Sequence, residues 1–161
     1  PVQIDRSLVL PDAVEAADVY EEGYQICELT LQYLEAINKS LENTPFKIAY
    51  RTRNEFLVYA VHRVKMTEGD KCQAFIKALD EMTFMKILSR IEGDKKKLTD
   101  KDGNPLLDKL EETVCKALNK ALEAYKTEGD ETKVMPQGQL VAKLGAMKIK
   151  LEKNYYCTFW D

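Results

Sequence analysis

The sequence has no phosphate-binding loop of the form G-x-x-x-x-G-K-[ST], and its 7 glycines form no phosphate cradle. No apolar strand ends in the paired acidic residues that hold Mg²⁺ and orient water. In-line phosphoryl transfer depends on positioning the phosphates and neutralising their charge, so a chain without these parts has no site for it. No nucleophile, base and orienting acid occur in a recognisable spacing either. We therefore expect no catalytic residues in this chain and no NTP hydrolysis by it alone.

Patterns for metal binding are also missing. The four cysteines, Cys27, Cys72, Cys115 and Cys157, form no C-x-x-C pair, and the single histidine, His62, is distant from them in sequence. A zinc site is therefore not expected, and His62 is interpreted as a structural or surface residue. The first three cysteines fall among apolar residues of helical patterns, which predicts reduced, buried thiols in a cytosolic protein.

Long apolar runs and strong net charge are absent as well. No stretch approaches the ~20 consecutive apolar residues needed to cross a bilayer, and no signal peptide is recognisable. The formal net charge of -3 at pH 7 gives no general reason to bind nucleic acid or an anionic membrane. The length of 161 residues suits one domain, 1–161. The chain begins at Pro1 rather than Met, which predicts a trimmed fragment or a processed product.

Helical periodicity dominates what is present. Apolar residues recur at three- and four-residue spacing in segments that are bounded by Pro, Gly and polar residues. This pattern predicts an all-α, single-domain bundle of about five helices, with short extended segments at both ends. The end of the third helix is apolar nearly all round and should be deeply buried. The expected helices are 20–41, 53–66, 72–91, 105–125 and 139–153, with a long loop at 127–138 and extended segments at 1–10 and 155–160.

Two arginines, Arg51 and Arg53, lie at the expected start of the second helix. A helix N-terminus carries unpaired N–H groups and roughly half a positive charge, so cations there are mildly unfavourable unless an anion joins them. A phosphate would satisfy both the N–H donors and a guanidinium group. The alternative is structural: Arg51 pairs with Glu55 four residues later, and Arg53 is solvated. The residues alone leave both interpretations open.

The aromatic C-terminal end also has two interpretations. Phe159 and Trp160 could fold back over the helical core and close it. Alternatively, they form an exposed patch that anchors a neighbouring subunit, because aromatic side chains are common interface hot spots. Phe159 and Trp160 are therefore candidate interface residues.

Three segments resemble landmarks of McrB-family AAA+ proteins, the NTPase subunits of modification-dependent restriction systems. We call them the landmark segments: Phe46–Glu55 (FKIAYRTRNE), Lys86–Gly93 (KILSRIEG) and Cys157–Trp160 (CTFW). They occur in the family's order and span most of the chain. The sequence departs from the family pattern, which usually has Gly at the position of Ala49, Pro at that of Ser89 and His at that of Glu92.

In such proteins these landmarks belong to the helical lid that follows the nucleotide-binding αβα core. The resemblance implies that this chain is an AAA+ lid and C-terminal region without its core, and that Arg51 or Arg53 occupies the sensor-2 position facing the nucleotide phosphates. It implies a cytoplasmic parent that binds GTP or ATP with Mg²⁺, forms a homo-oligomeric ring, works with an McrC-like nuclease subunit and meets DNA through other parts. No cofactor and no membrane contact are expected for this chain itself. The alternative function is a free-standing helical protein-interaction module.

Overall fold

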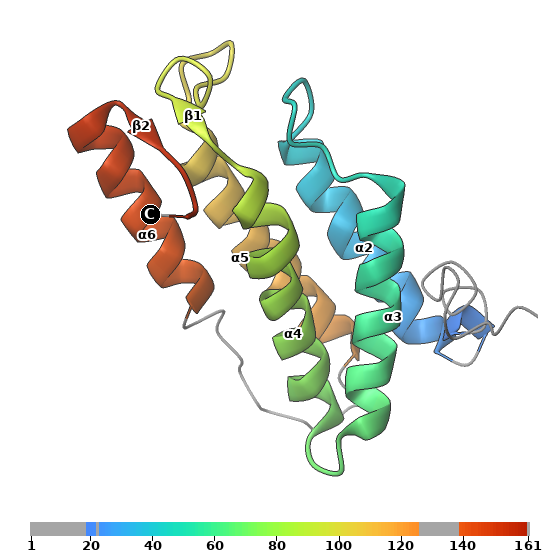
Figure 1. The fold of residues 1–161 in the computed structure, drawn as a ribbon. Helices are drawn as coiled ribbons and strands as arrows, with labels where there is room; N and C mark the ends of the chain where they lie inside the picture. The colour runs from blue at the N-terminus through green and yellow to red at the C-terminus, as the bar shows by residue number, and fades with distance from the viewer. Residues whose placement is uncertain (1–18, 22, 126–138, 161) are drawn as a thin grey trace, which may run out of the picture.

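The computed structural model describes residues 19–21, 23–125 and 139–160. Five α-helices in this part run side by side in alternating directions (Figure 1). The fold is therefore an all-α helical bundle, as the periodicity predicts. The expected extended segment at 1–10 and most of the expected loop at 127–138 lie outside the described residues. The helices are α2 (Tyr24–Ser40), α3 (Tyr50–Met66), α4 (Lys71–Met82), α5 (Leu106–Tyr125) and α6 (Gln139–Asn154).

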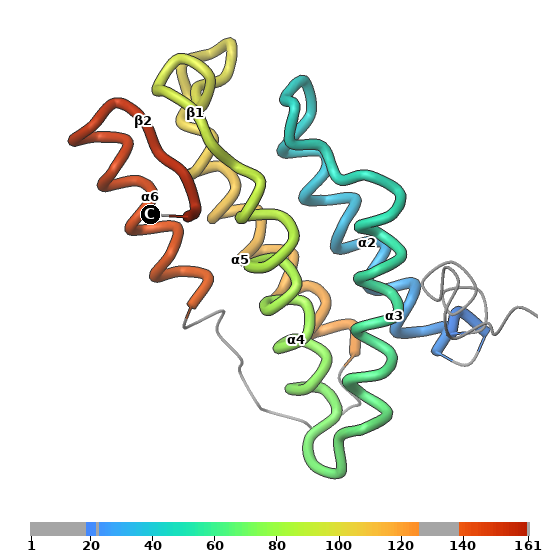
Figure 2. The backbone as a smooth tube through the Cα atoms, in the orientation of Figure 1, coloured from blue at the N-terminus to red at the C-terminus, as the bar shows by residue number. Residues whose placement is uncertain are grey.

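The core lies between the helices. α2 packs against α3 and α5, α4 packs against the same two helices, and α6 joins the bundle through α5 (Figure 2). Burying apolar surface contributes roughly 25 cal/mol per Å², so packing of the apolar faces decides where the helices lie more than helix propensity does. The large side chains that are fully buried include Tyr33, Phe56, Phe75, Leu79, Leu88, Leu107, Leu110 and Leu118.

α2 starts later than the predicted helix 20–41 because the chain turns at Gly23. A Cβ atom at Gly23 would lie 2.7 Å from Cγ2 of Val61, which is fully buried on α3. Val61 is β-branched and enclosed, so it has little room to move away. The prediction of one uninterrupted helix was therefore wrong at this point, where only glycine permits the close approach to α3.

α3 starts three residues before the predicted boundary at Arg53, so both arginines lie inside its first turn. The segment that leads into α3 is held by α2, because the N–H of Ile48 donates to Oδ1 of Asn38 at 2.7 Å. Ala49 then adopts an extended conformation with ψ 158°, and its carbonyl accepts from the N–H of Arg53 at 3.1 Å. A tertiary hydrogen bond thus places the helix start, which residue spacing alone could not indicate.

The predicted helix 72–91 is not one regular α-helix. α4 begins at the cap Asp70, which accepts from the N–H of Gln73 at 3.1 Å. After α4 the chain forms a π-helix, η1 (Thr83–Ile87), and a short 3₁₀ turn, η2 (Leu88–Arg90). Ile87 and Leu88 are buried as predicted, whereas Met85 in the middle of η1 is 44% exposed.

Buried Thr83 marks the change from α to π geometry. Its hydroxyl donates to the carbonyl oxygen of Leu79 at 2.6 Å. A hydroxyl has only one proton to donate, and Thr83 uses it in this bond. In the 2.5 Å contact between the two hydroxyls, Tyr33 is therefore the donor and Thr83 the acceptor. Hydroxyl bonds to the carbonyl four residues earlier bend helices, and here the bond coincides with the irregular turn.

A short antiparallel ribbon joins the two later landmark segments. β1 (Gly93–Asp94) pairs with β2 (Tyr156–Cys157), with Gly93 opposite Cys157. The expected extended conformation near the C-terminus is therefore confirmed for β2. The ribbon returns the chain from the end of α6 to the segment that follows η2 (Figure 1).

Candidate functional site

The two candidate sensor arginines face different neighbours. They are two residues apart, which separates their side chains by about 200° around a helix. Arg51 is paired with Glu55, its Nε lying 3.5 Å from Oε1, and its side chain is 83% exposed. This ion pair confirms the structural alternative for Arg51. Arg53 lies instead beside α2.

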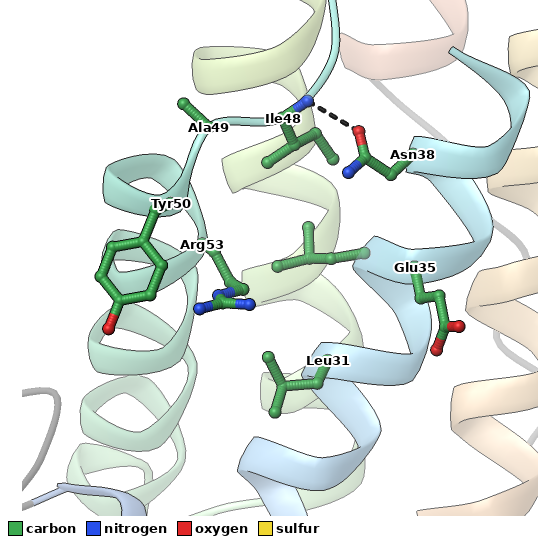
Figure 3. Close-up of a pocket in the computed structure, with 8 residues that line it drawn as sticks. Leu31, Glu35, Asn38, Ile48, Ala49, Tyr50 and Arg53 are labelled. Carbon is green, nitrogen blue, oxygen red and sulfur yellow. Dashed lines mark hydrogen bonds between the residues drawn. The ribbon is translucent and has the colours of Figure 1, made fainter. Parts of the chain in front are cut away.

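Arg53 lines a groove of about 420 Å³ between α2 and the start of α3 (Figure 3). Figure 3 shows the Arg53 side chain extending into the groove, which Glu35 on α2 also lines with its carboxylate directed away from Arg53. The groove is thus lined by both apolar and polar side chains, with one guanidinium reaching into it and one carboxylate at its edge. The other lining residues are Leu31, Leu34, Asn38, Ile48, Ala49 and Tyr50, besides Glu35.

The Arg53 guanidinium is stacked but not neutralised. Its central carbon lies 4.4 Å from the centre of the Tyr50 ring, which is within cation–π range. Among the residues that the structure describes, no carboxylate lies within ion-pair distance of Arg53. Arg53 is exposed, so its guanidinium is solvated as the alternative predicts, and its positive charge is available at the mouth of the groove.

The start of α3 adds backbone donors beside Arg53. The N-cap residue Ala49 offers no side-chain hydrogen bond, and no acidic residue lies in the first turn. The N–H groups of the first three residues of α3 are therefore open to water or to a ligand. Open N–H groups, the positive end of the helix dipole and a guanidinium together suit an oxyanion such as phosphate.

The three landmark segments meet at η1. Lys86 on η1 lies with Nζ 2.9 Å from Oε2 of Glu55 on α3. Phe84, also on η1, packs its ring against Phe159 with the ring centres 5.0 Å apart. No pattern in the sequence indicates these contacts, because the segments are far apart along the chain.

The structure separates the two candidate interface residues. Phe159 is buried against Phe84, and Lys143 lies with Nζ 4.6 Å from the centre of its ring. Trp160 contacts Phe159 edge to face at 4.9 Å between ring centres but remains 75% exposed. Phe159 therefore follows the fold-back interpretation, whereas Trp160 presents its ring to solvent.

All four cysteines are free thiols. Cys27 and Cys72 are buried as predicted, Cys115 is only half-buried, and none of the four forms a disulfide. Burial raises the pKa of the Cys27 thiol to about 11. Within residues 19–21, 23–125 and 139–160, no three His, Cys, Asp or Glu side chains gather to hold a metal, and no helix is long and apolar enough to cross a membrane.

A family model described as "Domain of unknown function (DUF8727)" matches residues 8–156. The chain belongs to this family. That description names no activity, substrate or partner for DUF8727 proteins. No curated protein and no solved structure matches the chain.

Asp80 on α4 is a half-buried carboxyl group away from the groove. Desolvation by burial, followed by repulsion from Glu81, raises its pKa from 3.8 to about 6. It is close enough to Tyr33 on α2 and Cys115 on α5 to raise the pKa of both. The charged form of Asp80 is therefore disfavoured in the folded protein.

We expect the free energy of unfolding to fall as the pH rises through the range from 3.8 to about 6, because the folded state holds the Asp80 proton where the unfolded chain releases it. Asp80→Asn should remove this slope. It should also raise the free energy of unfolding at neutral pH by on the order of 1 kcal/mol, a small figure because water screens a half-buried carboxylate. Urea unfolding across this pH range measures both effects. Glu123→Gln, at an exposed position on α5, should keep the slope, and an unchanged slope in Asp80→Asn would contradict the assignment.

Proposed function

We propose that this chain is the helical lid of an McrB-like AAA+ NTPase, with Arg53 facing the phosphates of a nucleotide held by a core outside the chain. The observation that carries the proposal is the groove at the start of α3, where a guanidinium without a carboxylate partner lies beside an uncapped helix N-terminus. A phosphate would meet fixed donors there without displacing an existing ion pair.

The geometry favours Arg53 over Arg51 for this role. Arg51 already shares Glu55 with Lys86 and lines no part of the groove. Arg53 extends over the groove and is held by the Tyr50 ring (Figure 3). The lid assignment itself depends on the resemblance of the three landmark segments.

The proposal extends to the parent protein. It would be a cytoplasmic NTPase that binds GTP or ATP with Mg²⁺, assembles as a homo-oligomeric ring, and works with an McrC-like nuclease subunit on DNA that other parts recognise. Within this chain the work is mechanical: the lid contacts the nucleotide and passes its state to a neighbouring subunit, for which exposed Trp160 is the contact residue that we assign.

A free-standing protein-interaction module is the second candidate. The exposed aromatic side chains near the C-terminus favour it, since Tyr155 is 67% and Trp160 is 75% exposed. The gene sequence that precedes residue 1 separates the two candidates. A reading frame that runs through a phosphate loop and an acidic strand end supports the lid, and a frame without them supports the module.

Arg53→Ala in the full-length protein should raise the dissociation constant for GTP or ATP by about 10- to 100-fold, since losing a charge-assisted hydrogen bond costs about 1.5–3 kcal/mol. Arg53→Lys should recover part of the affinity, because lysine keeps the charge but lacks the bidentate fork. Isothermal titration calorimetry measures each constant.

Arg51→Ala is the matched control for this experiment, because it removes a guanidinium from the same helical turn but not from the groove. Its affinity should stay within about twofold of the original, as expected for an exposed ion pair. Unchanged affinity in a folded Arg53→Ala protein would refute the role of Arg53. A full-length protein that binds neither nucleotide would refute the proposed function as a whole.

A further inference from the structure

The π-helix η1 connects two distant parts of the molecule through adjacent side chains. Lys86 reaches Glu55 on α3, with 2.9 Å between Nζ and Oε2. Phe84 reaches Phe159, and Phe159 in turn contacts Trp160. One short turn therefore contacts both α3, which carries Arg53, and Phe159, which precedes the exposed Trp160.

The link to α3 is the firmer of the two ion pairs that Glu55 makes. The Glu55 side chain is only 20% exposed, and its contact with Lys86 is shorter than the 3.5 Å contact with Arg51. The Lys86 side chain is 44% exposed against 83% for Arg51, and a shorter ion pair with a more enclosed cation is less screened by water. A movement at the start of α3 should therefore pull on η1 through Glu55 and Lys86.

A single π turn differs from a regular α turn by one residue. π-helices are rare, occur mostly as one-turn bulges within α-helices and are frequent at functional sites. In η1 the N–H of Leu88 bonds to the carbonyl of Thr83, five residues back. A return to the usual four-residue spacing would rotate the following residues by about 100° relative to α4. Phe84 and Lys86 would then change their contacts together.

We propose that η1 is a coupling element that transmits the state of the α3 N-terminus to Trp160 by exchanging its π turn for an α turn. The trigger, a nucleotide at Arg53, rests on the proposed function. The coupling itself rests only on the contacts of Lys86 and Phe84 with their partners. Its two states are the two registers of η1, and its two ends are Glu55 and Trp160.

Trp160 is the single tryptophan of the chain, so its fluorescence reports on this end directly. Acrylamide quenching of the intact chain without nucleotide should differ from the original by about 1.5-fold or more in Lys86→Met and in Glu55→Gln, because both cut the link and shift the population of the two registers. Lys86→Arg should restore the original quenching. Lys116→Met is the matched control, since it breaks the exposed Lys116–Glu112 pair on α5 and should change nothing.

Deletion of Met85 tests the register directly. Met85 is exposed within η1, and removing one residue from a π turn allows regular α spacing. This deletion should alter Trp160 quenching with far-ultraviolet circular dichroism retained. If the deletion does not fold, the Lys86 and Glu55 variants decide alone. Unchanged quenching in folded Lys86→Met and Glu55→Gln proteins would overturn the coupling. Because no nucleotide is present, failure of nucleotide binding is a separate result that bears on the proposed function only.

Discussion

Phe56→Ala should destabilise the protein by about 3–5 kcal/mol, the usual cost of deleting a fully buried aromatic ring. Phe56 is 0% exposed in the second turn of α3, and its ring centre lies 6.5 Å from that of Tyr33 on α2. The truncated side chain would leave a cavity that helices packed on several sides cannot readily close. Urea or guanidinium unfolding measures the loss.

Met66→Ala is the control for this substitution, because Met66 ends the same helix and is 82% exposed. Its effect should stay within about 0.5 kcal/mol. A loss well below 2 kcal/mol for Phe56→Ala would show that α3 does not pack on the core as described. Since Phe56 comes directly after the Arg51–Glu55 turn, such a result would also remove the support for the geometry of the groove.

Thr83→Val should cost about 1–3 kcal/mol, because it leaves the hydroxyl of Tyr33 buried without an acceptor. Burial also raises the pKa of Tyr33 well above its ordinary value, so the hydroxyl stays protonated and still needs an acceptor. Tyr33→Phe should cost less. In that variant the donor itself is gone, and Thr83 still donates to the carbonyl of Leu79.

A double-mutant cycle on these two positions separates the hydrogen bond from other effects of each change. The Tyr33→Phe/Thr83→Val protein should be less destabilised than the sum of the single changes, because neither hydroxyl is then left unpaired. The free energies of unfolding of the four proteins give the coupling. Simple additivity would show that the two hydroxyls do not interact in the folded protein.

Local patterns along the chain were sufficient for several features. The apolar spacing predicted α5 and α6 within one residue at each end, since each helix has one continuous apolar face and clear end signals. The spacing of Arg51 and Glu55 predicted their ion pair, because residues four apart are neighbours on any helix. These features depend on residues close in sequence.

Features that depend on contacts between distant residues were missed or left open. The start of α3 depends on Asn38, and the turn at Gly23 depends on the nearness of Val61. The geometry of η1 accompanies the hydroxyl pair of Thr83 and Tyr33. Hydrophobic periodicity does not indicate such partners, because it predicts which face of a helix is buried but not which residues that face contacts.

The candidate site shows the same division. Residue types and their order indicated a bundle of helices, two arginines at a helix start and an aromatic end. Packing of the helices placed Arg53 over the groove, and it buried Phe159 while leaving Trp160 in solvent. The sequence determines the direction in which each side chain leaves its helix, but only the packing of the other helices determines what that side chain meets.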